Sequence, residues 1–197
     1  MLGELQKRKL TKLFTMYDAR NLGILKLSDF EHLAQRLSEL RDWKPDSPAH
    51  ENITSKFLLL WNRMRAEIKK KSNNPVTSQS QYEVIDSQTR HEVNLDEWLT
   101  YHDAVMNDEN SRGEISALAT SLFSVIDTDE SGNLDKKEWT NFFRVYNIPV
   151  VYVEETFARI DQDGDGVLSM DEVLTTIQDF YYSNDPNASG NYMFGPM

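Results

Sequence analysis

One twelve-residue segment, residues 161–172, constrains the fold more than any other part of the chain. It reads Asp-Gln-Asp-Gly-Asp-Gly-Val-Leu-Ser-Met-Asp-Glu, with a carboxylate at every second position of its first half. A calcium ion takes six to eight oxygen ligands at about 2.3–2.6 Å, and a loop of this length supplies them from positions 1, 3, 5, 7, 9 and 12. Gly166 at position 6 permits the sharp turn. The predicted ligands are Asp161, Asp163, Asp165, the Val167 carbonyl, Ser169 and Glu172.

A second segment, residues 127–138, has the same spacing around Gly132. Apolar residues recur at helical intervals before and after both segments, so each loop is expected to join two helices. This arrangement is the EF-hand, and two matches in one chain strengthen each other. We therefore expect two Ca²⁺ ions, with Mg²⁺ as a possible competitor. The predicted ligands here are Asp127, Asp129, Ser131, the Asn133 carbonyl, Asp135 through a water molecule, and Glu138.

Residues 18–29 keep the frame of such a loop but not its ligands. Gly23 and Leu25 stand at the turn and strand positions. Positions 3 and 9, which need oxygen ligands, hold cationic side chains, and position 12 holds a carboxylate one methylene shorter than glutamate. We predict a structural loop that binds no Ca²⁺, in which Arg20 and Lys26 act as fixed internal cations beside the partner loop. The altered ligand positions are Arg20, Leu22, Lys26 and Asp29.

A fourth frame, residues 86–97, is intact only in its second half. Val93 fits the strand position, Asn94 fits a helix N-cap and Glu97 stands at position 12. The first half lacks two acids and the glycine, so no Ca²⁺ is expected. A second histidine does not follow the His-Glu pair at helical spacing, so the metalloprotease motif is absent. The replaced positions are Gln88, Arg90 and His91.

Four repeated helix–loop–helix frames predict an all-α fold. Each loop also needs a partner loop for its short strand, so the frames should pair. We expect two paired lobes with short β-bridges: residues 1–108 with the altered loops and residues 109–182 with the intact ones. Residues 111–113 are expected to separate the lobes, and residues 72–81 to form a surface insertion. Residues 183–197 form a tail that ends in large apolar side chains, which should dock on the protein or contact a partner. These side chains are Tyr192, Met193 and Phe194.

Composition excludes several classes of function. The chain has 21 Lys+Arg against 32 Asp+Glu, a net charge of −11, which argues against a nucleic-acid partner. Two Ca²⁺ would add +4 and leave −7. The chain has no cysteine, which excludes disulfides, thiol catalysis and cysteine-ligated zinc. It has no apolar run of membrane-spanning length, and it begins with a charged amphipathic stretch, so we expect a soluble, monomeric, cytoplasmic protein.

The four-frame layout, a long third helix and the C-terminal sequence resemble a known family. Residues 182–185 and 190–195, Tyr-Ser-Asn-Asp and Gly-Asn-Tyr-Met-Phe-Gly, are similar to the ending of the invertebrate sarcoplasmic calcium-binding proteins and, more closely, of calexcitin. The resemblance implies a compact all-α cytosolic protein with Ca²⁺ or Mg²⁺ in some of its EF-hands. It also implies a C-terminal segment packed into the N-terminal half. In that family the first loop usually binds and the fourth is often lost, which is the reverse of the pattern here.

The leading functional prediction is a calcium-binding protein without enzymatic activity, acting as a buffer or as a signal transducer. Sensors expose a methionine-rich groove on opening, whereas the methionines here are scattered. One alternative is a relative of the coelenterate photoproteins or luciferin-binding proteins, with His32, His50, His102 and the four tryptophans lining a cavity. Another is a sensor or scaffold whose tail binds an unknown protein partner.

Overall fold

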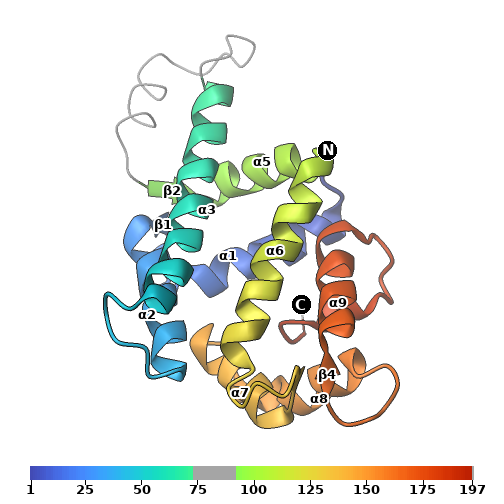
Figure 1. Cartoon of the computed structure of the whole chain (residues 1–197). Coiled ribbons are helices and arrows are strands. Elements are labelled where there is room, and N and C mark those ends of the chain that lie inside the picture. The colour runs from blue at the N-terminus through green and yellow to red at the C-terminus, as the bar shows by residue number, and fades with distance from the viewer. Residues whose placement is uncertain (73–91, 197) are drawn as a thin grey trace.

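The computed structural model describes residues 1–72 and 92–196, which are mostly helical (Figure 1). This confirms the predicted all-α class. The helices are α1 Glu4–Tyr17, α2 Leu27–Leu40, α3 Pro48–Ser72, α5 Leu95–Val105, α6 Glu109–Ile126, α7 Lys136–Val145, α8 Val153–Ile160 and α9 Met170–Tyr182. The strands are β1 Ile24–Lys26, β2 Glu92–Asn94, β3 Asn133–Leu134 and β4 Leu168–Ser169, and the short 3₁₀ helices are η1 Val150–Tyr152 and η2 Ser189–Tyr192.

The short strands join the loops in two antiparallel pairs, as predicted. Strand β1 pairs with β2, placing Leu25 opposite Val93, and β3 pairs with β4, placing Leu134 opposite Leu168. All four of these apolar side chains are buried. The first frame is therefore joined to the second and the third to the fourth, and each pair buries its central strand residues beneath the loops.

Residues 111–113 do not break the chain between the pairs, contrary to the sequence prediction. They lie within α6, which runs without interruption from Glu109 to Ile126. Ser111 donates its backbone N–H to the Asp108 carbonyl at 3.1 Å, as expected in a first helical turn. A glycine in a helix costs about 1 kcal/mol relative to alanine, which the packing of a long helix can offset. The predicted insertion beyond Ser72 and the first half of the second loop, with Gln88, Arg90 and His91, lie outside the described residues.

A single aromatic-rich core joins the two pairs. The ring of Tyr17 on α1 lies 5.0 Å from Phe30, 5.7 Å from Trp98 and 6.2 Å from Tyr146, measured between centroids. Because Tyr146 directly follows α7, this contact crosses from the first pair to the second. Helix α2 also contacts α6 and α7. The described residues of the two halves therefore share buried apolar surface.

The C-terminal tail packs mainly against the second pair, whereas the family resemblance implied the N-terminal half. Met193 and Phe194 are buried, and the Phe194 ring lies 4.9 Å from Phe180 and 6.0 Å from Phe142. Helix η2 contacts both α8 and α9 (Figure 1). A Cβ on Gly190 would lie 2.3 Å from the Phe180 backbone nitrogen, so only glycine permits this close approach to α9. The tail thus covers the two helices that flank the fourth loop.

Candidate metal centre

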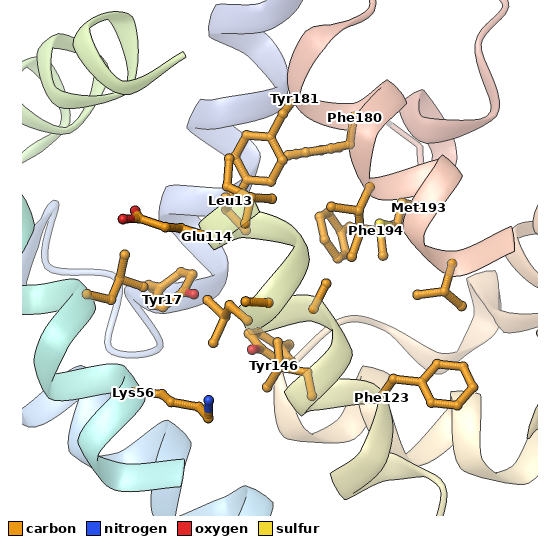
Figure 2. A pocket seen from close by; sticks show the side chains of 18 of the residues that line it. Leu13, Tyr17, Lys56, Glu114, Phe123, Tyr146, Phe180, Tyr181, Met193 and Phe194 are labelled. Carbon is orange, nitrogen blue, oxygen red and sulfur yellow. The ribbon is translucent and has the colours of Figure 1, made fainter. Parts of the chain in front are cut away.

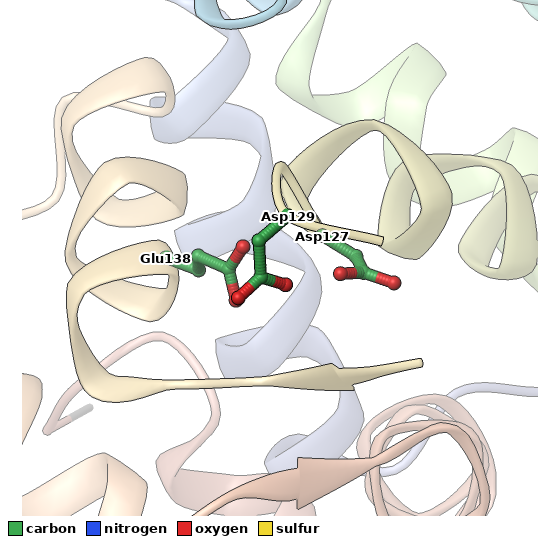
Figure 3. A group of neighbouring side chains, drawn as sticks. All are labelled: Asp127, Asp129 and Glu138. Carbon is green, nitrogen blue, oxygen red and sulfur yellow. The ribbon is translucent and has the colours of Figure 1, made fainter. Parts of the chain in front are cut away.

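The third loop brings three carboxylates together. Asp127, Asp129 and Glu138 each offer an oxygen, and these oxygens all lie within 4.8 Å of one another (Figure 3). Asp127 follows the last turn of α6, and its two carboxylate oxygens each accept a backbone N–H at 3.0 Å, one from Ser131 and one from Gly132. The Ser131 hydroxyl donates to the Asn133 carbonyl at 3.0 Å. The carboxylate oxygens at positions 1, 3 and 12 therefore surround one small volume, and the oxygens at positions 5 and 7 are hydrogen-bonded to each other.

Glu138 connects the third loop to the start of α7. It is only 4% exposed, and one carboxylate oxygen accepts the backbone N–H of Thr128 at 2.6 Å. The other oxygen accepts the backbone N–H of Asp135 at 3.0 Å, while the Asp135 carboxylate accepts the backbone N–H of Glu138 at 2.7 Å. This reciprocal pair is a capping box. The residue that would close the metal shell thus also begins the helix, so metal binding and helix initiation share the same side chains.

The fourth loop has a second cluster, in which Asp161, Asp163 and Asp165 offer oxygens within 4.8 Å of one another. Asp165 also accepts the Val167 backbone N–H at 2.9 Å. Glu172 lies outside this cluster but spans the loop, accepting the backbone N–H groups of Gln162 and Ser169, each at 2.8 Å. Gly166 adopts φ +87°, the left-handed conformation that the turn requires. All six predicted positions thus lie on one continuous loop closed by Glu172.

Hydrogen bonds favour the charged form of the carboxylates in both loops. Burial alone would raise the pKa of Glu172, but donors from Ser169 and Gln162 outweigh it and lower the pKa. Hydrogen bonding to Ser131, which includes its backbone N–H at 3.0 Å, lowers the pKa of Asp129. Ionised carboxylate oxygens are the ligands that hard divalent cations such as Ca²⁺ and Mg²⁺ prefer.

The first loop has the same hydrogen-bond frame but contains its own cation. Asp18 accepts the backbone N–H groups of Leu22 at 3.0 Å and Gly23 at 2.7 Å, as Asp127 does in the third loop. Asp29, 3% exposed, accepts the Lys26 N–H at 2.7 Å and pairs with the Arg20 guanidinium at 3.0 Å. The carboxylate at position 12 is thus neutralised within its own loop. The Lys26 ammonium instead pairs with Glu92 of β2 at 2.8 Å.

The second loop, within residues 92–97, keeps the predicted helix start. Asn94 accepts the backbone N–H of Glu97 at 2.9 Å, and Glu97 in return accepts the backbone N–H of Asn94 at 3.0 Å. This is the same capping box as in the intact loops.

A cavity of about 290 Å³ lies between the two pairs, and its lining is mostly apolar. Figure 2 shows Tyr17 of α1 and Met193 of the tail on opposite sides of it in this view. Of the residues proposed for a photoprotein-like cavity, His102, Trp98 and Trp139 line it, whereas His32, His50, Trp43 and Trp61 do not. The lining tyrosines were not expected from the sequence, because they lie on apolar helix faces and resemble ordinary core residues: Tyr17, Tyr101, Tyr146 and Tyr181.

Burial changes the ionisation of the polar groups around this cavity. It lowers the pKa of His102 to about 4, against the opposing effect of a hydrogen bond between its Nδ1 and the Trp98 carbonyl at 2.9 Å. Burial raises the pKa of Tyr101 to about 12 and that of Tyr17 well above its ordinary value. Histidine and tyrosine are therefore both uncharged here at neutral pH, and the cavity presents neutral hydrogen-bonding groups in an apolar wall.

Comparisons with known proteins match both the loops and the fold. A family model described as an EF-hand domain pair matches residues 115–178. Clytin from Clytia gregaria is 31% identical over 102 residues, 50% of this chain and 52% of clytin, so the chain spans about half the length of that relative. Calerythrin from Saccharopolyspora erythraea is 21% identical over 174 residues, 88% of this chain and 90% of calerythrin.

Two solved structures match the whole chain. A sarcoplasmic calcium-binding protein from amphioxus gives a TM-score of 0.71 at 15% identity, and a calcium-loaded apo coelenterazine-binding protein from Renilla muelleri gives 0.65 at 17% identity. Each comparison covers 100% of both chains. At such identities the likeness shows the fold alone. Within the described part of the chain, no helix is long and apolar enough to cross a membrane. Residues 115–178 therefore belong to the EF-hand domain-pair family.

Proposed function

We propose that this protein binds two Ca²⁺ ions, one in each intact loop, and acts without enzymatic activity as a cytoplasmic, monomeric calcium buffer or closed signal transducer. Mg²⁺ is the expected competitor. The observation that carries the proposal is the pair of carboxylate clusters, each with oxygens within 4.8 Å of one another. Among the ion pairs of the described residues, none neutralises a carboxylate of either cluster. Three anions this close repel one another, and a divalent cation relieves that repulsion.

The tail supports a closed protein over an open sensor. Opening of a sensor hand changes the angle between its two helices and exposes an apolar groove. Here η2 contacts both helices of the fourth hand, and Met193 and Phe194 occupy the apolar surface that such opening would expose. A change in the α8–α9 angle would therefore have to expel two buried side chains, at about 1.5–3 kcal/mol each. No protein target is assigned.

The test is a calorimetric Ca²⁺ titration in physiological Mg²⁺. We expect two sites in the native chain and the loss of one site each in Glu138→Gln and Glu172→Gln. Glu155→Gln is the matched control, because Glu155 is exposed and pairs with Arg159 outside the loops. It should retain both sites. The finding of a third stoichiometric site, or of no site in the native chain, would refute the proposal.

A parallel measurement with a hydrophobic dye separates buffer from sensor. A closed protein should bind little more dye with Ca²⁺ than without it, because the tail remains docked. A large calcium-dependent rise in dye binding would contradict the closed form and identify a sensor that releases its tail.

A second candidate function is the binding of a small apolar molecule in the cavity between the two pairs. The specific observation is the 290 Å³ volume with uncharged His102 and tyrosines in its wall. A structural neighbour is described as a coelenterazine-binding protein. Titration with coelenterazine should then quench tryptophan fluorescence, since Trp98 and Trp139 line the cavity. The cavity-filling variant Ala119→Phe should abolish quenching and retain both Ca²⁺ sites. Absence of quenching in the native chain would exclude coelenterazine as the ligand.

A further inference from the structure

The first EF-hand, made of α1, the loop at residues 18–29 and α2, provides two cations that bind backbone carbonyls of the calcium-binding pair. On α1, Lys9 is fully buried, and its ammonium donates to the carbonyls of Asp179 at 3.0 Å and Ser183 at 2.7 Å, at the C-terminal end of α9. A cation suits this end of a helix. The second cation is Arg41, the residue that directly follows α2. The first EF-hand, whose loop lacks the calcium ligands, is thus attached to the two EF-hands whose loops keep them.

The Arg41 contact reaches the third calcium loop itself. One guanidinium nitrogen donates to the Asp127 carbonyl at 2.6 Å and another to a Glu130 carboxylate oxygen at 2.8 Å. The Arg41 side chain is 15% exposed and that of Glu130 is 78% exposed, so solvent screens the ion pair, whereas the bond to the Asp127 carbonyl is partly buried. Asp127 is position 1 of the loop, and its own N–H donates to the Phe123 carbonyl at 2.8 Å. Both peptide groups that flank this calcium ligand are therefore held.

The fourth loop lacks an equivalent of the carboxylate that Arg41 binds. Its position 4 is Gly164, with φ +73°, whereas the third loop has Glu130 there with φ +59°. A side chain at positive φ is sterically disfavoured, and glycine avoids this cost. Glu130, whose side chain binds Arg41, therefore has a strained backbone conformation in the third loop. The two calcium loops differ here in their attachment to the N-terminal half.

We propose that Arg41 is a positioning residue for the third calcium loop, through which the first hand sets the Ca²⁺ affinity of residues 127–138. This rests on the proposed function. The first hand can do this without calcium because the Arg20–Asp29 ion pair takes the place of an ion in its loop. By holding Asp127 before the metal arrives, Arg41 reduces the ordering cost of binding. Because Glu130 neutralises Arg41, the guanidinium adds little net positive charge near the site.

The coupling is reciprocal. If attachment to the first hand strengthens Ca²⁺ binding in the third loop, Ca²⁺ there must strengthen the attachment by the same factor. The Trp43 ring lies 5.9 Å from the Arg41 guanidinium, so its fluorescence should report a change in this attachment when Ca²⁺ binds. The difference in calcium-induced fluorescence change between the native chain and Trp43→Phe isolates the signal from this residue.

The test compares charge-neutral double variants with a single loop left active. In the Glu172→Gln background, only the third loop should bind. Adding Arg41→Ala and Glu130→Ala removes one charge of each sign and should weaken Ca²⁺ binding by about threefold to tenfold. The matched control removes the Lys136–Glu154 ion pair, at 2.7 Å, which also lies beside the third loop but joins α7 to α8 within the same half. It should leave the affinity unchanged.

Two further variants separate positioning from a merely structural role. In the Glu138→Gln background, where only the fourth loop binds, the Arg41/Glu130 double variant should leave Ca²⁺ affinity unchanged, whereas general destabilisation would weaken both loops. Arg41→Lys keeps a charged donor but cannot bind both acceptors with two nitrogens of one planar group. It should recover part of the Ca²⁺ affinity of the third loop relative to Arg41→Ala.

An unchanged or raised third-loop affinity in the Arg41/Glu130 double variant would overturn the inference. An equal loss of affinity in both loops would also overturn it. Absence of Ca²⁺ binding in the native chain would instead refute the proposed function, so the two failures are distinguishable.

Discussion

The loops at residues 18–29 and 127–138 have the same hydrogen-bond frame. In each, the first aspartate accepts two backbone N–H groups from the turn, and the carboxylate at position 12 accepts the N–H of position 9. They differ in what balances the carboxylate at position 12. Asp29 is paired with Arg20 of its own loop, whereas Glu138 clusters with Asp127 and Asp129.

An EF-hand loop usually has two roles, which are to shape the turn between its helices and to bind a diffusible ion. The difference between these two loops separates the roles. The frame of hydrogen bonds and the buried strand residue are enough to shape the loop, whatever cation it holds. A tethered guanidinium balances the position 12 carboxylate at any calcium concentration, and therefore makes that part of the fold independent of metal. Uncompensated carboxylates leave the third loop able to respond to a diffusible ion. The N-terminal half can thus serve as a fixed support for a calcium-responsive C-terminal half.

Removal of calcium should produce the largest contrast between the two halves. Each site filled at 100 times its dissociation constant stabilises the native state by about 2.7 kcal/mol, so two sites contribute about 5 kcal/mol. Chemical denaturation with Ca²⁺ and with a chelator measures the total. Hydrogen exchange should show calcium-dependent protection of loop amides at residues 127–138 and 161–172, and little at 18–29. Equal protection of the first loop would contradict the comparison.

A pH titration should sharpen the comparison, because the N-terminal half carries a buried group that responds to protons. His102 on α5 has its pKa lowered to about 4 from an ordinary 6.5. Between these values the unfolded chain binds a proton that the native chain does not, so stability falls as pH falls from 6.5 to 4. The expected loss is about 3 kcal/mol, from about 1.4 kcal/mol per pH unit.

The measurement is chemical denaturation across this pH range in calcium-free buffer, for the native chain and for His102→Gln. Glutamine can still donate to the Trp98 carbonyl but does not titrate. Because the remaining titrating groups are common to both proteins, the difference between the two curves isolates His102. Parallel curves would show that the imidazole is protonated equally in the folded and unfolded states.

Removal of the tethered cation in the first loop should destabilise the protein regardless of calcium. Arg20→Ala leaves Asp29, 3% exposed, without its partner. Breaking a fully buried pair costs about 3–5 kcal/mol, but Arg20 is 44% exposed and solvent screens the pair, so about 2 kcal/mol is expected. The cost should be the same with Ca²⁺ and with chelator. Arg20→Lys, which keeps the charge, is the control, and a calcium-dependent cost would show that an ion enters the first loop.

The sequence predicts the parts of this comparison that depend on local pattern. Loop spacing, glycines and apolar stripes predicted the all-α fold, the loop pairing and the convergence of Asp127, Asp129 and Glu138, because these features depend on residues within twelve positions of one another. The same holds for the tethered cation, since Arg20 and Asp29 share one loop.

The sequence does not predict contacts that depend on how distant elements pack. The bond from Arg41 to the Asp127 carbonyl spans 86 residues, and a backbone acceptor leaves no mark in a sequence. The place of the tail was missed for a similar reason, since Met193 and Phe194 fit any apolar surface. The break expected at residues 111–113 was wrong because a weak helix former was given more weight than the apolar stripe that follows it in α6.

The smallest expected effect comes from comparing the N-cap residues at the same position of the second and fourth loops. Asn94 in the second loop and Ser169 in the fourth stand at the same loop position, and each caps the following helix by accepting a backbone N–H, from Glu97 at 2.9 Å and from Glu172 at 3.3 Å. Replacing either with alanine should cost about 1 kcal/mol in chelator, measured by chemical denaturation.

Calcium should then distinguish the two positions. The cost of Asn94→Ala should not change when Ca²⁺ is added, because no ion is expected in its loop, whereas the cost of Ser169→Ala should rise by less than about 1 kcal/mol as the ion loses a direct or water-mediated oxygen. Equal calcium dependence at both positions would mean that the ion stabilises the shared core and not the individual loop. A rise confined to Ser169 would show that the cap and the metal ligand are one residue in the fourth loop, and that the second loop has kept the first role after losing the other.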